Sequence, residues 1–204
     1  MLEKLQQLDR QVFIYLNGLG SETFDPMWEI ITKQISWIPI FAIILYLTFK
    51  RLGTKHAFLI IGMITLLLLV TDQTTNLIKF TIKRLRPGNN PELAGLIRSV
   101  QNRKSFSFIS GHASNSMAVA FFLYRVLHPY IKYMGFFFIW PLIFAYSRIY
   151  LGLHYPGDIL TGYAFGLLTG WLVLKLYIYL RDRYFPKQQE DLDNPTNSEP
   201  VTNG

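Results

Sequence analysis

The sequence predicts an all-α integral membrane bundle of five to six transmembrane helices, with an amphipathic segment at the N-terminus. Two observations support this fold class. Half of the 204 residues are hydrophobic and only 16% are charged, whereas soluble domains carry about 25% charged residues. The hydrophobic residues gather in five long runs, and almost no stretch alternates apolar with polar residues as a half-buried strand does. The chain has no cysteine, which excludes thiol catalysis, disulfides and cysteine-ligated zinc.

The N-terminal segment mixes apolar and charged residues. Its apolar residues recur near helical spacing, and they are Leu2, Leu5, Leu8, Val12, Phe13 and Leu16. This pattern predicts a helix that lies at the membrane interface, packs on the bundle or forms a short sixth membrane element. The segment does not resemble a secretory signal, because it lacks an uninterrupted apolar stretch and a small-residue cleavage site. Asp25-Pro26 then indicates the start of a further helix.

Five apolar runs follow, at residues 28–49, 57–82, 113–127, 133–145 and 159–180. A membrane-spanning helix needs about 17–25 mostly apolar residues. The first, second and fifth runs are long enough alone, whereas the third and fourth need flanking residues. We expect a single membrane-embedded domain over residues 1–185. Residues 186–204 hold three prolines, four acidic residues and no aromatic residue, which predicts a disordered tail.

The order of the runs predicts the topology. Counting crossings places the connection 84–110 and the turn 147–158 on one face of the membrane, and the loops 50–55 and 125–132 on the other. Both faces carry many lysines and arginines, so the positive-inside rule does not orient the chain. Short basic loops are the usual cytoplasmic pattern, and we therefore expect a functional role for the basic residues of the other face. The net charge of +7 sits mostly at the ends of apolar runs, which favours membrane anchoring over a nucleic-acid partner.

The first group of unusual polar residues lies at the end of the second run. Asp72 and Lys79 are seven residues apart and share one helical face. Charged residues in membrane segments cost about 2.5–3.5 kcal/mol each and are functional by default. Beyond Lys79 the positive charge rises up to Arg86-Pro87, and lysine and arginine side chains bind phosphate. A buried structural pair followed by a snorkelling basic cap explains the same residues.

The second group is Ser110-Gly111-His112, at the start of the third run. Ser110 is a good helix N-cap, and Gly111 lets a ligand approach the backbone closely. The unpaired N–H groups of a helix start form an anion site, with His112 beside it. A plain helix cap with an incidental histidine is the alternative.

The third group is Ser147-Arg148-x5-His154-x3-Asp158. Because Pro156-Gly157 forbids a continuous helix, we expect the chain to turn there, with Asp158 in the first turn of the last helix. A carboxylate on one imidazole nitrogen fixes the tautomer and makes the other nitrogen a better base or nucleophile. Arg148 is placed to neutralise an anion. A satisfied interfacial histidine is the alternative for His154.

The remaining histidines and the tryptophans call for no catalytic role. His56 and His128 fall in short loops, where interfacial solvation explains them. Trp28, Trp37, Trp140 and Trp171 are expected to form an interfacial belt and to pack.

Taken in order, Lys79-x6-Arg86-Pro87, Ser110-Gly111-His112 and Ser147-Arg148-x5-His154-x3-Asp158 resemble the three signature motifs of the type-2 phosphatidic acid phosphatase superfamily. This superfamily includes membrane lipid phosphatases and shares its site with vanadium haloperoxidases. The resemblance covers residues 79–158, and the apolar runs match the helical bundle of the family. One departure is Ile109, where the family usually has proline; it alters the turn but removes no chemical group.

The resemblance implies a role for each site residue. His154 would be the nucleophile that forms a phosphohistidine, Asp158 would orient it, and His112 would act as general acid and then as base for water. The phosphoryl oxygens would be bound by Lys79, Arg86, Ser110, Gly111 and Arg148. The cationic side chains would supply the countercharge, so we expect neither a metal ion nor another cofactor.

The resemblance further implies a lipid phosphate as substrate, in a multi-pass protein of the cell membrane with its active site on the extracytoplasmic face. Phosphatidylglycerol phosphate is narrowly preferred over undecaprenyl pyrophosphate without residue-level evidence, and phosphatidic acid and diacylglycerol pyrophosphate remain open. Transfer of phosphate between lipids needs the same residues. A lipid or anion carrier would need neither an activated nucleophile nor an acid, and a metal hydrolase built on the same histidines would lose activity in chelator.

Overall fold

The computed structural model describes residues 1–185, so the predicted tail at 186–204 lies outside the described residues. Within the described part the chain is helical and has no strand, which confirms the all-α class. The six α-helices are α1 Leu2–Gly18, α2 Asp25–Ile31, α3 Ile38–Ile82, α4 Gly111–Leu127, α5 Ile139–Tyr150 and α6 Pro156–Tyr184. Short 3₁₀ turns lie at Glu22–Phe24, Gln34–Trp37, Pro87–Asn89, Pro91–Leu93 and Met134–Phe138.

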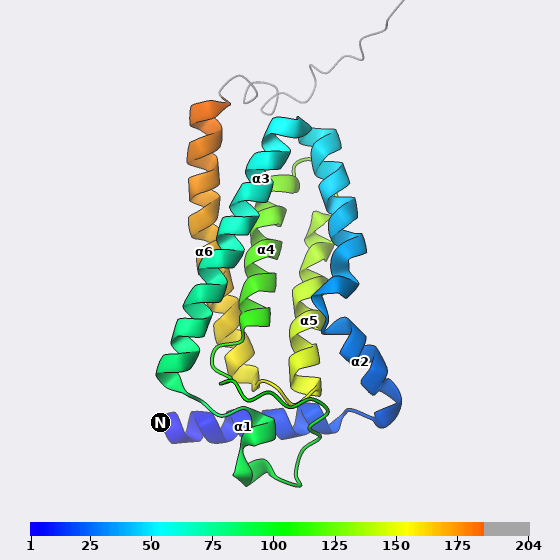
Figure 1. Cartoon of the computed structure of the whole chain (residues 1–204), viewed down its shortest axis with the longest axis vertical. Helices are drawn as coiled ribbons and strands as arrows, with labels where there is room; N and C mark the ends of the chain where they lie inside the picture. Colours follow the sequence, from blue (N-terminus) through cyan, green and yellow to red (C-terminus); the bar gives the residue numbers. More distant parts are fainter. Residues whose placement is uncertain (186–204) are drawn as a thin grey trace, which may run out of the picture.

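Helix α3 is folded back on itself at Gly53, where φ is 75° and ψ is 171°. This backbone conformation is outside the helical region and is one that glycine adopts readily. The arms before and after Gly53 therefore run in opposite directions, as Figure 1 shows at the top of the molecule. They correspond to the first and second predicted runs. The first run, 28–49, is not one continuous helix, because α2 ends at Ile31 and α3 starts only at Ile38, where Pro39 in the first turn favours a helix start.

The bundle is built around α4 and α6, which contact one another along their lengths. Glycines on α6 allow this close approach. A Cβ atom at Gly162 would lie 2.8 Å from the carbonyl oxygen of Ser110, and one at Gly166 would lie 2.4 Å from that of Ser114. Small residues spaced by four are a common means of bringing helix backbones together in membranes. The packing of α6 on α4 fixes the start of α4, where the second motif lies.

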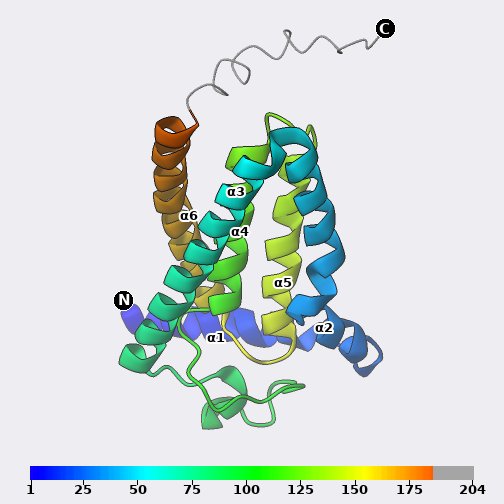
Figure 2. The ribbon, with the colours of Figure 1, turned by 45° about the horizontal axis from the view of Figure 1, so that its top comes forward.

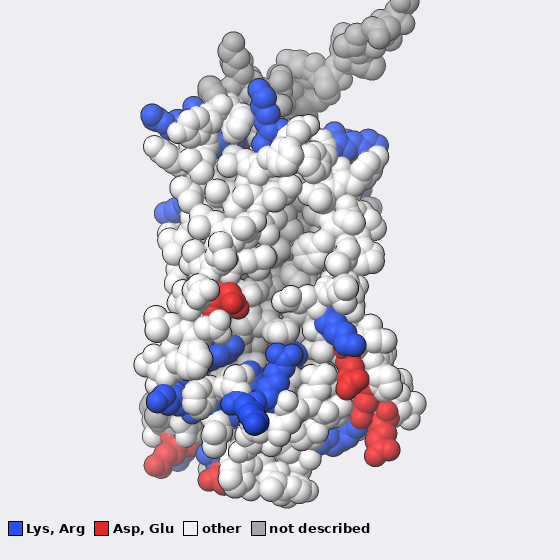
Figure 3. Space-filling view, viewed as in Figure 1, with Lys and Arg blue, Asp and Glu red and all other residues white. Residues whose placement is uncertain are grey.

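The outer surface of the bundle is apolar. Figure 3 shows a nearly uncharged belt between two zones of Lys and Arg at the ends of the molecule. Two helical stretches, Gln34–Leu93 and Pro156–Tyr184, are long and apolar enough to cross a membrane, and Met134–Tyr150 is a shorter apolar stretch. These features are those of a membrane protein. The number of five to six spans stays a prediction.

Helix α1 lies across one end of the bundle rather than along it (Figures 1 and 2). Its second half is anchored, because Phe13 and Asn17 are fully buried, while Leu5 and Leu8 are exposed. The Asn17 amide donates to the carbonyl oxygens of Arg98, Ile149 and Tyr150 at 3.0 to 3.1 Å and accepts from the Arg98 N–H at 2.7 Å. One buried amide thus ties α1 both to the connection 84–110 and to the end of α5.

Candidate active site

The three motifs meet at the end of the bundle that α1 covers. The crossing count correctly predicts that the connection 84–110 and the turn after α5 lie at the same end (Figure 2). Five of the eight predicted site residues are buried polar or charged side chains, namely Arg86, Ser110, Arg148, His154 and Asp158. Gly111 is also buried, and Lys79 and His112 are partly buried.

The chain turns between His154 and Asp158, as Pro156-Gly157 predicts. The His154 N–H donates to the carbonyl oxygen of Arg148, and α6 starts at Pro156. In the first turn of α6, Oδ2 of Asp158 accepts the Tyr155 N–H at 3.0 Å and lies 3.5 Å from Nδ1 of His154. That separation is longer than an ordinary hydrogen bond, as catalytic contacts often are before substrate binds. The structure brings the predicted pair together with Nδ1 facing the carboxylate.

The other ring nitrogen of His154, Nε2, lies 3.1 Å from Nη1 of Arg86. A guanidinium group has donors only, so Nε2 must present its lone pair. The proton of the neutral imidazole is therefore on Nδ1, on the side of Asp158. Burial, and then the charges of Arg86, Arg148 and Lys79, hold the pKa of His154 well below its usual value. His154 is thus neutral at physiological pH, with the lone pair of Nε2 directed at the Arg86 guanidinium group.

Arg86 is held in place by the connection that follows it. Its Nε donates to the Ser105 carbonyl oxygen at 2.8 Å, Nη1 to that of Leu153 at 2.8 Å and Nη2 to the Ser105 hydroxyl at 3.0 Å. The side chain remains a cation at neutral pH, fixed beside the reactive nitrogen.

Arg148 has an unused donor. Its Nη1 donates to the Thr32 hydroxyl at the end of α2, whereas its buried Nε has no hydrogen-bond partner among the described residues. A buried donor without a partner is costly unless a ligand or water satisfies it. The guanidinium group is therefore ready to bind an anion.

The start of α4 contributes the second motif to the site. Ser110 is the N-cap, as predicted, and its hydroxyl accepts the Ala113 N–H at 3.4 Å. Its own N–H donates to the Asp158 carbonyl oxygen at 3.0 Å, which joins the second and third motifs. The open side of Gly111 faces the Lys79 ammonium, which would lie 3.5 Å from a Cβ atom there. Lys79 thus lies beside the helix start, where unpaired N–H groups favour an anion.

His112 lies in the first turn of α4. Its ring stacks on that of Phe144, with centroids 4.9 Å apart and planes inclined by 28°. Phe144 is itself buried, so the imidazole is held by an apolar wall from α5. Ile109, which stands where the resembled family has proline, is buried at the same turn.

Sequence reasoning missed several residues of this end. Arg84 donates to Oδ1 of Asp158 at 2.8 Å and to Oδ2 of Asp9 at 2.7 Å, and the Thr32 hydroxyl accepts from Arg148. Arg84 was visible only as one charge in a basic stripe. The interpretation of His56 as a solvated loop residue is wrong, because its side chain is 2% exposed and its ring lies 4.9 Å from that of Phe185. The loop is continuous with α3, so it packs against the end of α6.

His128 and the tryptophans agree with the sequence interpretation. His128 is exposed and lies over Tyr124. Trp28 stacks on Tyr150, with ring centroids 5.1 Å apart, and Trp37 and Trp140 pack against one another.

An apolar helical bundle with a neutral histidine, a carboxylate and buried cations at one end defines a membrane enzyme that acts on a phosphorylated substrate. The chain belongs to the PAP2 superfamily, the type-2 phosphatidic acid phosphatases that its motifs resemble, and the family model matches residues 56–182. It is a membrane lipid phosphatase of this superfamily.

Curated relatives and solved structures agree with this assignment. The chain is 33% identical to the lipid A 4'-phosphatase of Bacteroides thetaiotaomicron over 201 residues, which cover 96% of this chain and 86% of that protein. It is 30% identical to the lipid A 4'-phosphatase of Porphyromonas gingivalis, over 90% of this chain and 78% of that one. Its fold matches the transmembrane PAP2-type phosphatidylglycerolphosphate phosphatase of Bacillus subtilis with a TM-score of 0.66 and 23% identity, over 85% of this chain and 86% of the other.

Proposed function

We propose that the protein hydrolyses a lipid phosphate monoester through a phosphohistidine on His154, without a metal ion. The observation that carries this proposal is the contact between Nε2 of His154 and Arg86. A neutral imidazole whose lone pair points into a cluster of cations is ready to attack a phosphoryl group that those cations bind. A carrier needs the cations alone, and the neutral, oriented histidine is unexplained in that alternative.

The reaction has two steps. Burial and then the charge of Arg148 hold the pKa of His112 well below its usual value in the free protein, and a bound phosphoryl dianion opposes this effect and favours the imidazolium. Nε2 of His154 attacks phosphorus in line, and the bond to the lipid oxygen breaks as this protonated His112 donates its proton to that oxygen. Asp158 faces Nδ1 and stabilises the imidazolium that forms. His112, now neutral, takes a proton from water, and the resulting hydroxide displaces phosphate from His154. Transfer to another lipid would need an alcohol in place of water in the second step.

The phosphoryl oxygens fit the cations around His154. Arg86 and the free Nε of Arg148 would bind two of them, and Lys79 with the N–H groups at Ser110-Gly111 the third. Preorganised charge is usually the largest catalytic contribution, and phosphoryl transfer depends on it heavily. The same side chains provide the countercharge that a magnesium ion supplies elsewhere.

A groove beside the site suits an acyl chain. It has a volume of about 290 Å³ and lies between the two arms of α3, α4 and α5. Phe144, whose ring stacks on His112, is part of its wall, and Ile64 and Leu68 line it from the second arm of α3. The groove therefore begins next to the general acid, where the leaving group of the substrate would lie.

One stripe of α3 changes from apolar to polar to cationic on the way to the site. Ile64 and Leu68 are followed on the same helical face by Asp72, Asn76 and Lys79. Asp72 is exposed, and the Asn76 amide donates to its carboxylate at 3.3 Å. From Leu68 to Lys79 the stripe spans about 16 Å. Such a stripe matches a lipid with an uncharged polar group between its phosphate and its acyl chains.

These contacts favour an acylated sugar phosphate of the lipid A type as the substrate. A carboxylate one to two turns from the phosphate site would bind hydroxyl and amide groups but would repel a second phosphate. Both curated relatives described above act on lipid A. Phosphatidylglycerol phosphate is the second candidate. Undecaprenyl pyrophosphate is disfavoured, because the carboxylate would repel its adjacent second phosphate.

The extent of the domain and its orientation in the membrane are proposed together with this function. We infer that residues 1–185 form one multi-pass domain in the cell membrane and that the active site faces the extracytoplasmic side. The exposed basic loops at the opposite end are the usual cytoplasmic pattern.

The deciding experiment is phosphate release by purified protein in detergent with excess chelator. Lipid A, phosphatidylglycerol phosphate and undecaprenyl pyrophosphate are compared, with His154→Ala as the control. Release from lipid A that is lost in His154→Ala is the expected result. Loss of activity in chelator would contradict the metal-independent mechanism, and release that persists in His154→Ala would contradict the nucleophile.

The Asp72→Asn variant tests the choice of substrate. Removing the carboxylate should raise the rate on phosphatidylglycerol phosphate relative to lipid A by roughly 10-fold, because like charges brought together cost several kcal/mol. Asp182→Asn, which removes an exposed carboxylate at the other end of the bundle, is the matched control. An unchanged ratio would remove the argument from Asp72.

A further inference from the structure

We propose that Arg84 is a positioning residue for the Asp158–His154 pair, and that Asp9 on α1 holds Arg84 in place. The N-terminal helix would thereby be part of the machinery that orients the nucleophile. This inference rests on the proposed function, in which His154 attacks phosphorus and Asp158 orients it.

A chain of ionic contacts leads from α1 to the nucleophile. Arg84 bridges two carboxylates, with Nη1 2.8 Å from Oδ1 of Asp158 and Nη2 2.7 Å from Oδ2 of Asp9. The Asp158 side chain is fully buried, and that of Asp9 is 14% exposed. The guanidinium group also lies over the Tyr155 ring, 3.9 Å from its centroid. Three contacts thus fix both the position and the plane of the Arg84 head group.

Arg84 determines which oxygen of Asp158 is left for the histidine. Because Oδ1 is bound to Arg84, the carboxylate cannot rotate, and Oδ2 stays between the Tyr155 N–H and Nδ1 of His154. A fully buried carboxylate also needs a compensating charge, and removing its partner is strongly destabilising for the ionised form. Arg84 supplies both the orientation and the charge.

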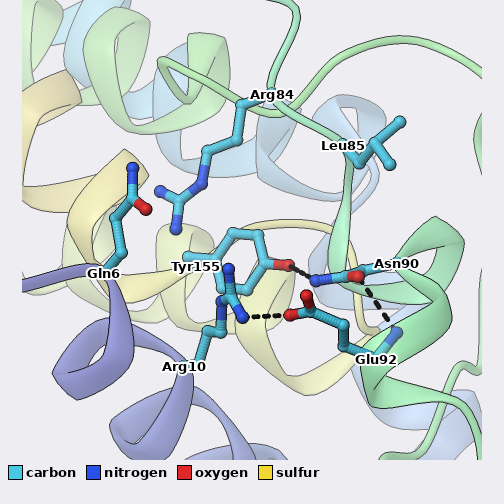
Figure 4. Close-up of a pocket in the computed structure, with 7 residues that line it drawn as sticks. All are labelled: Gln6, Arg10, Arg84, Leu85, Asn90, Glu92 and Tyr155. Atoms are coloured by element: carbon cyan, nitrogen blue, oxygen red, sulfur yellow. Dashed lines mark hydrogen bonds and ion pairs between the residues drawn. The ribbon is translucent and has the colours of Figure 1, made fainter. Parts of the chain in front are cut away.

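Arg84 is distinct from the phosphate-binding arginines. Arg86 contacts Nε2, the attacking nitrogen, whereas Arg84 contacts the carboxylate on the Nδ1 side of the same ring. Away from Asp158, Arg84 lines a separate cavity of about 230 Å³, where it lies between Gln6 and Tyr155 (Figure 4). We therefore expect its loss to affect the chemical step and not the binding of substrate.

Asp9 joins α1 to the start of α6. Its Oδ1 accepts the Gly157 N–H at 2.7 Å, and its Oδ2 accepts from Arg84. A carboxylate is stabilised at a helix N-terminus. A Cβ atom at residue 157 would lie 2.9 Å from the Asp9 carboxylate, so glycine is needed for this approach. Asp9 thus holds Arg84 and the helix that carries Asp158 at the same time.

The test compares Arg84→Gln with Arg10→Gln in the full chain. Arg10 lies one residue after Asp9 and pairs with Glu92 at the outer side of the same cavity (Figure 4), so it is a matched control that removes the same charge. We expect Arg84→Gln to lower kcat by about 10- to 100-fold, the usual effect of losing such a supporting partner. KM should stay within about twofold. The acid limb of the pH–rate profile should move to higher pH, since a positive charge beside the pair opposes its protonation. Arg10→Gln should change neither kcat nor the position of the acid limb.

Two further variants keep the inference testable if Arg84→Gln fails to fold. Arg84→Lys retains the charge but cannot bridge both carboxylates, so it should keep the acid limb in place while lowering kcat. Asp9→Asn should lower kcat less than Arg84→Gln, with folding followed by thermal unfolding. A raised KM at unchanged kcat in Arg84→Gln would make Arg84 a substrate-binding residue, and an unchanged kcat and profile in all three variants would overturn the proposal. Activity in His154→Ala would instead overturn the proposed function itself.

Discussion

Both ends of the bundle carry basic residues but use them differently. At the end that α1 covers, Arg86 and Arg148 are buried and converge on His154. At the other end most cations are exposed, among them Lys50, Arg51, Lys55, Arg125 and Lys132. Figure 3 shows basic residues at both ends, separated by the apolar belt.

Burial, and not the number of charges, distinguishes a binding site from an anchor. Exposed cations interact with water and lipid head groups at little cost, whereas each buried charge is unfavourable unless a partner compensates it. Arg84 has two carboxylate partners, but Arg148 has a hydroxyl and an unpaired donor. A bound phosphoryl group would supply the partner that Arg148 lacks. The histidines at the two ends test this comparison most strongly.

His154→Ala should abolish turnover, with kcat lower by at least about 10⁴-fold, because the nucleophile cannot be replaced by its neighbours. His56→Ala removes a buried imidazole at the opposite end and should leave kcat unchanged. Phosphate release and the thermal unfolding of both variants are measured together. Loss of activity in a folded His56→Ala protein would break the distinction between the two ends.

The arginines provide the next comparison. Arg148→Ala removes a buried donor that we place on a phosphoryl oxygen, and kcat/KM should fall by about 10²- to 10³-fold. Arg125→Ala removes an exposed cation near the end of α4 and should leave it unchanged. Vanadate should protect the wild type from thermal unfolding, since a trigonal-bipyramidal oxyanion resembles the transition state. Equal vanadate protection of Arg148→Ala would contradict the phosphate-binding role.

Much of this site could be predicted from the sequence because its parts are local. Ser110 is a cap whose hydroxyl accepts the N–H of a residue three positions later, and Pro156-Gly157 forces the turn that brings Asp158 towards His154. Each of these effects acts over a few residues and depends on no distant partner. The motifs then meet because short connections return the chain to the same end.

The remaining contacts depend on distant parts of the chain. Arg84 meets Asp9 because α1 crosses the end of the bundle, and neither the spacing nor the composition of α1 predicts that angle. Asn17 looks like an ordinary polar residue until the carbonyl groups at the end of α5 surround it. The burial of His56 likewise requires the far end of α6.

Helix packing should matter most where it supports the site. Gly162→Ala places a Cβ atom 2.8 Å from the Ser110 carbonyl oxygen, whereas one at Gly62 on α3 would meet no atom within 4 Å. Overpacking of this kind costs about 1–3 kcal/mol. We expect Gly162→Ala to lower both the unfolding temperature and the activity, and Gly62→Ala to change neither appreciably. Equal stability of the two variants would show that the contact between α4 and α6 relaxes easily.

The smallest expected effect is a shift in the pH dependence of the reaction. His154 must be neutral to attack, and burial followed by the charge of Arg86 lowers its pKa. The wild-type acid limb due to His154 should therefore lie below about pH 6.5, the usual histidine value. The Arg86→Gln substitution removes this charge, so it should raise the pKa of His154 and move the acid limb to higher pH. Arg51→Gln removes an exposed charge at the opposite end and should leave it in place.

Comparing the variants separates the ionisation of the enzyme from the ionisation of its substrate. A lipid phosphate monoester also titrates near pH 6, but its free ionisation is the same for every variant and cancels in the difference. The profiles of kcat/KM for wild type, Arg86→Gln and Arg51→Gln report the free enzyme. If the limb moves equally in both variants, the two ends of the bundle do not differ electrostatically at His154. If it moves only in Arg86→Gln, the buried cations hold the nucleophile neutral, and the exposed ones at the other end do not reach it.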